Sequence, residues 1–210
     1  MTRRPSPARS RRESVPVPPR IVAGRHRGRP LVVPPGLEVR PTASRARESL
    51  FNILMHADLG GDGTSPLPGA RVLDAFAGSG ALGIEALSRG AAHATFLDSS
   101  AEAVRAIGEN LRTLNESGNA RVIRTDVTQP QPAPAGAGCV LAFLDPPYKS
   151  GLGSRALAAL ARTGWLAPGA LCVVEVGARE ELEPVSGFAV VDERRYGAAR
   201  IVFLRYQAAA

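Results

Sequence analysis

The sequence has few cysteines and histidines, and both shortages exclude a class of site. Its 210 residues include two cysteines, Cys139 and Cys172, each inside an apolar run, so we expect free buried thiols and no disulfide framework. The three histidines, His26, His56 and His93, are scattered without a partner at ligand spacing. We therefore expect no metal site.

Long apolar runs are absent as well. No uninterrupted apolar stretch approaches the roughly 20 residues that span a membrane, so we expect no membrane segment. The start of the chain is basic and broken by prolines, without the apolar core of a secretory signal. The same prolines disfavour the amphipathic helix of an organellar transit peptide. These observations predict a cytoplasmic protein, which we expect to be a monomer.

Positive charge is concentrated at the start of the chain. Residues 1–47 hold 12 arginines against two acids, whereas the rest of the chain has three more acids than bases. A localised cationic segment is typical of proteins that bind a polyanion such as nucleic acid. For residues 1–20, a solvated tail that only aids solubility is the alternative. Further along, we expect phosphate contacts from four arginines, for which ordinary solvated side chains are the alternative: Arg25, Arg27, Arg29 and Arg40.

Composition divides the chain into a tail, an extension and a main domain. Residues 1–20 are rich in proline, arginine and serine and are predicted to be disordered. Residues 21–57 form the extension, in which we expect two short strands around a turn, followed by a helix. That helix should run from about Ala43 to His56 with Thr42 as its cap. A Gly- and Pro-rich linker then leads to the main domain, residues 70–207.

In the main domain, predicted strands and helices alternate from Arg71 onward. This order indicates an α/β fold with a mostly parallel, Rossmann-like sheet of seven strands, whose sites lie at the carboxyl ends of the strands. The last two strands should meet at a tight turn at Tyr196-Gly197 and be antiparallel. Ser99, with Glu102 three residues later, is expected to cap the second helix of this domain. The proline-rich stretch TQPQPAPAGAG should leave the crossover helix after the third strand short or absent.

The first predicted strand leads directly into a glycine-rich turn, DAFAGSGALG. Gly78, Gly80 and Gly83 have the spacing of the dinucleotide-binding fingerprint, placed between a strand and a helix. Asp98 ends the second strand about 20 residues later, where an acid binds ribose hydroxyls. The pattern favours an adenosine-containing cofactor. A turn needed only for close packing of the helix on the strand is the alternative.

The acid before these glycines favours S-adenosylmethionine over a nicotinamide dinucleotide. Asp74 would repel a pyrophosphate at the turn, but it would attract the sulfonium and ammonium groups of S-adenosylmethionine. Asp126, after the third strand, is placed where an adenine amino group could bind. A nicotinamide-dependent oxidoreductase stays open as an alternative.

The fourth predicted strand ends in a second motif, AFLDPPYK. The Asp145 carboxylate and the Pro146 carbonyl can accept hydrogen bonds from both N–H groups of an exocyclic base amine, which aims its lone pair at a methyl donor. Pro146 and Pro147 fix the backbone, and Tyr148 offers a ring on which an extruded base can stack. No strong base is needed for this transfer. A simple end to the strand, with Tyr148 packed in the core, is the alternative.

With these motifs the sequence resembles the bacterial RsmD family, which methylates a guanine N2 in 16S ribosomal RNA with S-adenosylmethionine. The resemblance covers about residues 20–206 and includes RIVAGRHRGRPLVVP, RPTASRARESLFNIL, DAFAGSGALGIEALSRGA, FLDPPY and GWLAPGALCVVE, in that order. It implies a class I methyltransferase fold, 16S ribosomal RNA or the small subunit as partner, and a catalytic motif from Asp145 to Tyr148. The cofactor-binding residues that we expect on this basis are Thr42, Arg45, Asp74, Ala77, Gly78, Gly80, Asp98, Ser99, Asp126 and Val127.

The sequence departs from the family pattern at two places. The family usually has glutamate at the position of Asp98, and the stretch after Asp126 has prolines where a helix is usual. A DNA adenine-N6 or cytosine-N4 methyltransferase stays open as a function, because such enzymes share the Asp-Pro-Pro-Tyr chemistry. This chain, however, has no segment long enough for a DNA target-recognition domain. A non-catalytic RNA-binding module stays open as well.

Overall fold

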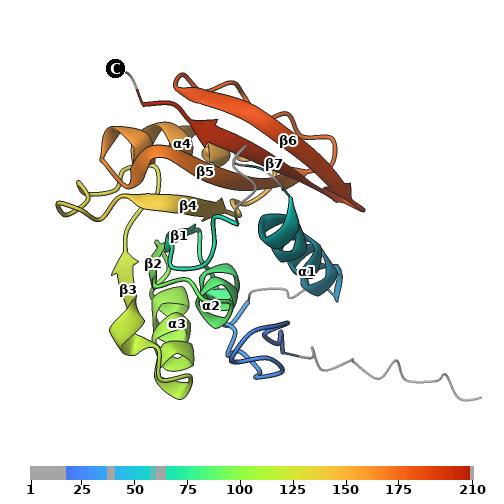
Figure 1. Cartoon of the computed structure of the whole chain (residues 1–210), viewed down its shortest axis with the longest axis vertical. Coiled ribbons are helices and arrows are strands. Elements are labelled where there is room, and N and C mark those ends of the chain that lie inside the picture. Colours follow the sequence, from blue (N-terminus) through green and yellow to red (C-terminus); the bar gives the residue numbers. More distant parts are fainter. Residues whose placement is uncertain (1–17, 37–40, 58, 60–64, 209–210) are drawn as a thin grey trace, which may run out of the picture.

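The computed structural model describes residues 18–36, 41–57, 59 and 65–208. Within this part, a seven-stranded sheet has the order β3-β2-β1-β4-β5-β7-β6 (Figure 1). The strands are β1 Arg71–Ala75, β2 His93–Asp98, β3 Ala120–Arg124, β4 Cys139–Leu144, β5 Leu166–Gly177, β6 Phe188–Tyr196 and β7 Ala199–Tyr206. β1 to β5 are parallel, and β7 runs antiparallel to both β5 and β6. The predicted Rossmann-like sheet with one antiparallel C-terminal strand is confirmed.

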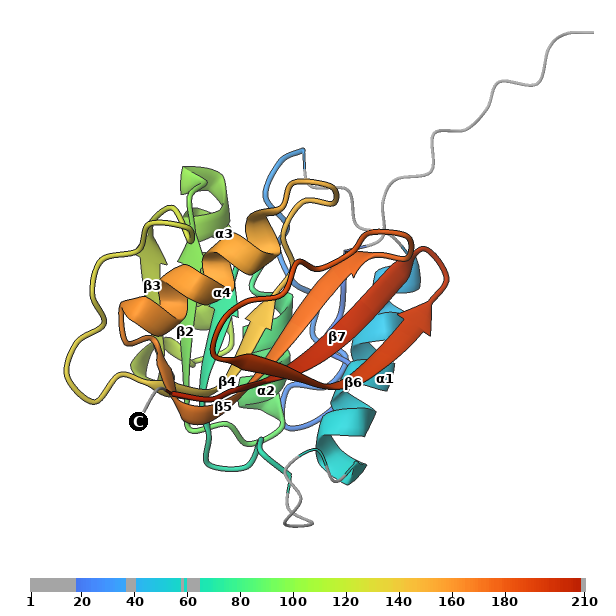
Figure 2. The same ribbon diagram turned by 90° about the horizontal axis from the view of Figure 1, so that it is seen from above.

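Four α-helices in the described part cover the two faces of the sheet unequally. They are α1 Pro41–His56, α2 Ala81–Ser88, α3 Ala101–Thr113 and α4 Leu152–Arg162. Figure 2 shows α4 on one side of the sheet and α2 on the other. Because side chains alternate along a strand, Val72 of β1 faces the core with α1, α2 and α3, while Leu73 faces the core with α4. Both faces of the central strands are therefore apolar, as expected of a parallel sheet.

The crossover between β3 and β4 has no helix, as its prolines predict. It is held instead by the segment before β5, where Trp165 Nε1 donates to the Gln131 carbonyl at 2.9 Å and Ala133 N donates to the Thr163 carbonyl at 2.8 Å. Trp165 is buried among the side chains of the α4 core. Trp165 therefore anchors this crossover to the core that the α4 side of β5 shares.

Three local predictions were wrong by one or two residues. The helix cap is Ser100 and not Ser99, because Asp98 already accepts from Ser100 N, and Ser100 Oγ then accepts from Ala103 N at 3.1 Å. Helix α1 begins at Pro41, the position where proline is favoured in a first turn, so Thr42 lies inside it. The turn between β6 and β7 is formed by the two residues 197 and 198.

The described residues also bear on the predictions for the cysteines, for membrane segments and for metal sites. Both cysteines are free and buried, and burial raises the pKa of each thiol to about 12. No described helix has the length and apolarity needed to cross a membrane, and the described residues contain no cluster of three potential metal ligands. Most of the predicted tail (1–17), Arg40 and part of the linker (60–64) lie outside the described residues.

The expected N-terminal hairpin is a loop rather than two strands. Its arms are joined by one antiparallel bridge, between Arg20 and Pro30. Proline has no N–H to donate to a ladder, so Pro30 and the prolines that flank the segment prevent longer pairing. Two helices of the main domain supply the missing backbone partners.

Buried polar side chains of α2 and α3 bind the backbone of this N-terminal loop. Glu85, fully buried on α2, accepts from Val22 N at 2.8 Å and from Ala23 N at 3.0 Å. Asn110, buried on α3, accepts from Val32 N at 2.7 Å and donates to the Val32 carbonyl at 2.9 Å. Each of these contacts satisfies backbone groups that a strand pair would otherwise satisfy.

Glu85 also neutralises two arginines. Arg89 Nε lies 2.8 Å from Glu85 Oε1, and Arg47 Nε of α1 lies 3.9 Å from Glu85 Oε2. Arg47 Nη2 in turn donates to the Arg20 carbonyl at 2.6 Å. One buried carboxylate thus links α1, α2 and the N-terminal loop.

We expect the variant Glu85→Ala to lose about 3–5 kcal/mol of unfolding free energy, because it leaves buried arginines and two backbone N–H groups without their acceptor. Urea denaturation measures this loss. The matched control is Glu109→Ala on α3, whose side chain is exposed, and its urea midpoint should stay at the wild-type value. Equal midpoints for the two variants would show that Glu85 does not hold the fold.

Candidate active site

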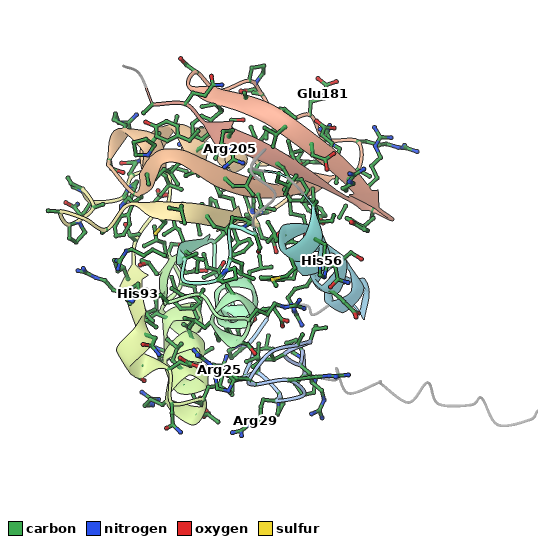
Figure 3. The ribbon with its side chains drawn as sticks, in the orientation of Figure 1. Arg25, Arg29, His56, His93, Glu181 and Arg205 are labelled. Carbon is green, nitrogen blue, oxygen red and sulfur yellow. The ribbon has the colours of Figure 1, made fainter. Side chains whose placement is uncertain are left out.

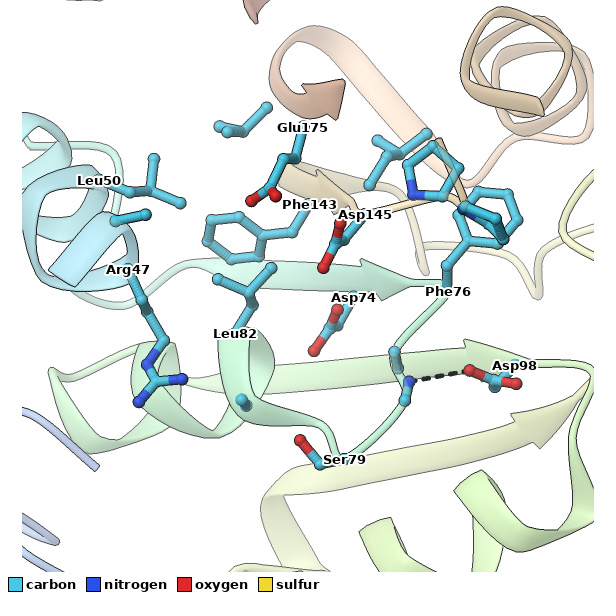
Figure 4. A pocket seen from close by; sticks show the side chains of 18 of the residues that line it. Arg47, Leu50, Asp74, Phe76, Ser79, Leu82, Asp98, Phe143, Asp145 and Glu175 are labelled. Carbon is cyan, nitrogen blue, oxygen red and sulfur yellow. Dashed lines mark hydrogen bonds between the residues drawn. The ribbon is translucent and has the colours of Figure 1, made fainter. Parts of the chain in front are cut away.

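A cavity of about 620 Å³ lies at the carboxyl ends of β1, β2, β4 and β5 (Figure 4). This is the edge at which a parallel α/β sheet places its sites, and the volume is in the range of small-molecule pockets. Most of its lining comes from the glycine turn after β1, the end of β2, the motif after β4, and side chains of α1 and β5. The predicted site residues among them are Asp74, Ala77, Gly78, Asp98, Ser99, Asp145, Pro146, Pro147 and Tyr148.

The glycine turn is shaped by both packing and hydrogen bonding. Gly78 and Gly80 have positive φ angles of 55° and 76°, which glycine adopts without strain. At Gly83 a Cβ atom would lie 2.4 Å from the Phe96 ring, so only glycine lets α2 pack this closely on β2. Gly78 N donates to Asp98 Oδ2 at 2.8 Å, which fixes the turn against the end of β2. The third glycine therefore serves packing, while the first two bend the chain at the cavity.

Asp74 is buried beneath the cavity, with 2% of its surface exposed. Its Oδ2 accepts from Gly83 N at 2.8 Å. Burial raises the pKa of Asp74 to about 8, and the negative charges of Asp145 and Asp98 add to the rise. At neutral pH most Asp74 side chains therefore carry a proton. The sequence predicts a negatively charged Asp74, whereas burial leaves the side chain mostly protonated and neutral before a ligand binds.

The motif after β4 faces the cavity. All four of its residues, from Asp145 to Tyr148, line the cavity wall. Tyr148 is half-buried, and its hydroxyl donates to Glu175 Oε1 at 2.6 Å. The alternative in which Tyr148 packs into the core is therefore wrong. Tyr148 lines the same cavity as Asp74 and Asp98.

Sequence reasoning missed two charged residues of this cavity, Glu175 and Arg47. Glu175 is the one acid inside the apolar run ALCVVEV, and an acid near the carboxyl end of a buried strand is the signal that could have identified it. Arg47 comes from α1 and is 7% exposed. Burial lowers the pKa of its guanidinium, while the nearby Glu85 carboxylate opposes that change. No pattern in the sequence of α1 identifies this inward-facing arginine.

Three predicted cofactor residues, Asp126, Val127 and Gly80, do not line the cavity. The Asp126 carboxylate bends back onto its own turn, where Oδ1 accepts from Thr128 N and Thr128 Oγ1, both at 2.8 Å. Val127 is buried in the α4 core. Gly80, also absent from the cavity wall, caps the start of α2. Thr42 and Arg45 lie in the first turns of α1, where side chains are outside the described part.

Three of the four predicted RNA-binding arginines, Arg25, Arg27 and Arg29, lie in the N-terminal loop, which packs against the last residues of α2 and α3. α2 starts at the cavity and ends at Ser88, where the Ser88 carbonyl accepts from Arg25 N at 2.9 Å. The Arg29 guanidinium donates to the Thr113 carbonyl at the end of α3 (Figure 3). The backbone of Arg25 therefore lies at the opposite end of the eight-residue helix α2, which is about 12 Å long, from the glycine turn. Arg25 is further committed to an ion pair with Glu116 at 2.7 Å.

Comparison with known proteins identifies the family. A family model described as "Conserved hypothetical protein 95" matches residues 19–205. The ribosomal RNA small subunit methyltransferase D of Escherichia coli (strain K12) is 42% identical over 156 residues, which are 74% of this chain and 73% of the relative. The chain belongs to the RsmD family of S-adenosylmethionine-dependent methyltransferases.

Two further matches cover more of the chain. The RsmD relative from Haemophilus influenzae is 37% identical over 183 residues, which are 85% of this chain and 89% of the relative. The solved structure of yhhF from Escherichia coli has a TM-score of 0.73 and 36% identity, and the match covers 90% of this chain and 98% of that one. The fold of this RsmD family member is therefore shared over nearly the whole described part.

The charge of the cavity lining in this RsmD family member matches the positive charge of the family's cofactor. Besides the mostly protonated Asp74, three acids line it, Asp98, Asp145 and Glu175, and Arg47 is the one basic residue among its described lining residues. Such a site disfavours a pyrophosphate and favours a ligand that carries positive charge.

The charge state of Asp74 predicts how stability depends on pH. Because its folded pKa is raised from 3.8 to about 8, the stability that this group contributes is complete below pH 3.8 and is lost as the pH rises to about 8. The variant Asp74→Asn keeps an acceptor for Gly83 N but does not titrate. We therefore expect its unfolding free energy, relative to wild type, to increase across that pH range and to level off above it. Urea denaturation at a series of pH values measures the difference.

The control for this series is Glu181→Gln, a change in the exposed loop after β5, for which the difference from wild type should not vary with pH. A pH-independent difference for Asp74→Asn as well would contradict the raised pKa.

Proposed function

We propose that this RsmD family member transfers a methyl group from S-adenosylmethionine to the exocyclic N2 amine of a guanine in small-subunit ribosomal RNA. The names of the relatives support ribosomal RNA as substrate. The observation that carries the proposal is the single cavity that both the glycine turn and the Asp145–Tyr148 motif line. It gives the cofactor and the acceptor amine one shared space.

The chain supplies positioning for this reaction. The Asp145 carboxylate and the Pro146 carbonyl accept one hydrogen bond each from the amine, which draws its lone pair out of conjugation with the ring. Two prolines in succession hold that carbonyl in place, so the acceptors need no reorganisation during the reaction. The Tyr148 ring, fixed by Glu175, gives the extruded base a surface for stacking.

S-adenosylmethionine supplies an electrophilic methyl group: the amine lone pair forms the new N–C bond, the C–S bond breaks, and its electron pair stays on sulfur as the neutral thioether. The nitrogen then carries a positive charge and is strongly acidic, so its extra proton passes to the Asp145 carboxylate and on to water. No base stronger than a carboxylate is required.

On the cofactor side we propose roles for the residues of β1 and β2. Each Asp98 carboxylate oxygen accepts one backbone hydrogen bond, from Gly78 N or from Ser100 N, and has a lone pair left. With these lone pairs Asp98 would bind the ribose hydroxyls. Asp74 would lose its proton when a cationic ligand enters, because positive charge favours its ionised form. Ala77 and Ser99 would contact the ligand through the cavity wall.

The function is tested by radiolabelled methyl transfer to small ribosomal subunits and their RNA, with duplex DNA as a parallel substrate. We expect label in the RNA, recovered after nuclease digestion as N2-methylguanosine. Asp145→Ala should reduce the rate at least about 100-fold, the effect of removing a group that stabilises a transition state, while S-adenosylhomocysteine binding is retained.

The control variant for this assay is Glu181→Ala, which lies outside the cavity and should keep wild-type activity. Label in DNA with unlabelled ribosomal RNA would contradict the proposal and would favour a DNA amine methyltransferase.

We also propose that Arg27 and Arg29 contact RNA at a distance from the target base, since both are exposed at the ends of α2 and α3. Replacing both by alanine should raise the KM for RNA several-fold and reduce its salt dependence, because phosphate contacts release counterions. The kcat and the affinity for S-adenosylhomocysteine should not change. Steady-state kinetics at two salt concentrations measure this, and an unchanged KM would assign these arginines to the solvated surface.

A further inference from the structure

Glu175 lies beside Asp145 on the neighbouring strand. β4 and β5 are parallel, and Leu144 pairs with Val174, so Asp145 and Glu175 are the next residues on each chain. Adjacent strands are about 4.8 Å apart, and side chains at equivalent positions leave the same face of a sheet. Figure 4 shows both carboxylates directed into the same part of the cavity.

The surroundings of Glu175 favour a role as hydrogen-bond acceptor. One oxygen accepts from the Tyr148 hydroxyl at 2.6 Å. Within the described part, no arginine, lysine or histidine forms an ion pair with Glu175. A carboxylate has about four lone-pair sites on two oxygens, so a single bond from Tyr148 leaves it able to accept again.

Guanine differs from the other amino bases at the atom next to its amine. Its ring nitrogen N1 carries a hydrogen, so N1–H and the N2 amine form a row of donors. In adenine and cytosine the corresponding ring nitrogen is an acceptor. A second carboxylate beside the amine-binding acceptors therefore matches guanine and repels the lone pair of the other two.

We propose that Glu175 determines the specificity for guanine: one oxygen accepts from N1–H of the target base, and the other holds Tyr148 against the ring. This inference rests on the proposed function, because it places the guanine amine at Asp145 and Pro146. It adds to that function a reason why the site selects guanine. Sites that bind a substrate N–H group can reject an analogue without it by up to about 10⁴-fold, because the buried acceptor is left unpaired.

The test replaces the mapped target guanosine in the RNA by 2-aminopurine riboside. This base keeps the amine at C2 but has no hydrogen on N1. We expect wild-type protein to methylate it at least 100-fold more slowly than guanine. In Glu175→Gln the side-chain NH₂ group can donate to the bare N1, so the guanine rate should fall and the ratio of 2-aminopurine to guanine rates should rise at least 10-fold. Because 2-aminopurine also lacks O6, the measurement compares the ratio of 2-aminopurine to guanine rates between wild type and variant. The effect of the missing O6 is common to both proteins and cancels in that comparison.

The variant Tyr148→Phe separates this role from a purely positioning one. If Glu175 only held the Tyr148 hydroxyl, Tyr148→Phe and Glu175→Gln would lower the guanine methylation rate by the same factor. Both variants would then keep the wild-type ratio of 2-aminopurine to guanine rates, and this result would overturn the inference. A wild-type protein that methylates both bases equally would overturn it without any variant, even if Glu175→Gln did not fold. Retained S-adenosylhomocysteine binding checks that the variants are intact.

The failure of the inference is distinguishable from failure of the proposed function. Wild-type protein that transfers methyl groups to guanine N2, with an unchanged base ratio in Glu175→Gln, overturns the role of Glu175 alone. Wild-type protein that transfers no methyl group to any guanine N2 of ribosomal RNA overturns both.

Discussion

The structure depends on a buried acid, Asp74, that lies beneath a cavity which further acids line. Parallel strands end at one edge of the sheet, so Asp74, Asp98 and Asp145 meet around one cavity although they are far apart in sequence. The raised pKa of Asp74 follows from burial, to which the charges of its neighbours add. A cationic ligand relieves that cost, whereas a phosphate would increase it. This electrostatic constraint links the fold to the cofactor of the RsmD family.

A second buried acid connects the site to the rest of the chain. Glu85 binds the backbone of the N-terminal loop and faces Arg47, which reaches the cavity from α1. Pro19, just before that loop, also lines the cavity. Loss of the Glu85 contacts would therefore disturb the cavity wall as well as the fold. Removing one partner of a buried charged group lowers the free energy of unfolding. The Glu85 contacts therefore hold the loop in a defined position, although it has no regular strand pairing.

The sequence predicted the parallel sheet, the glycine turn and the Asp145–Tyr148 motif, because hydrophobic periodicity and strand ends are local signals. It could not predict Glu175 or Arg47 as cavity residues, since their roles depend on which strands and helices become neighbours. For the same reason the sequence could not place Arg25 and Arg29: their charge is visible in it, but the packing of the loop against the last residues of α2 and α3 is not. Asp126 was placed correctly after β3, yet its carboxylate bonds to Thr128 in its own turn.

The central claim is that one cavity holds the methyl donor beside the proline-stiffened acceptor of an amine. A crystal structure of the protein with S-adenosylhomocysteine tests it most directly. The account predicts that the ligand occupies the space between the glycine turn and Pro146–Tyr148, with its ribose at Asp98 and its sulfur facing Asp145. A ligand bound elsewhere, or bound with its sulfur directed away from Asp145, would contradict it.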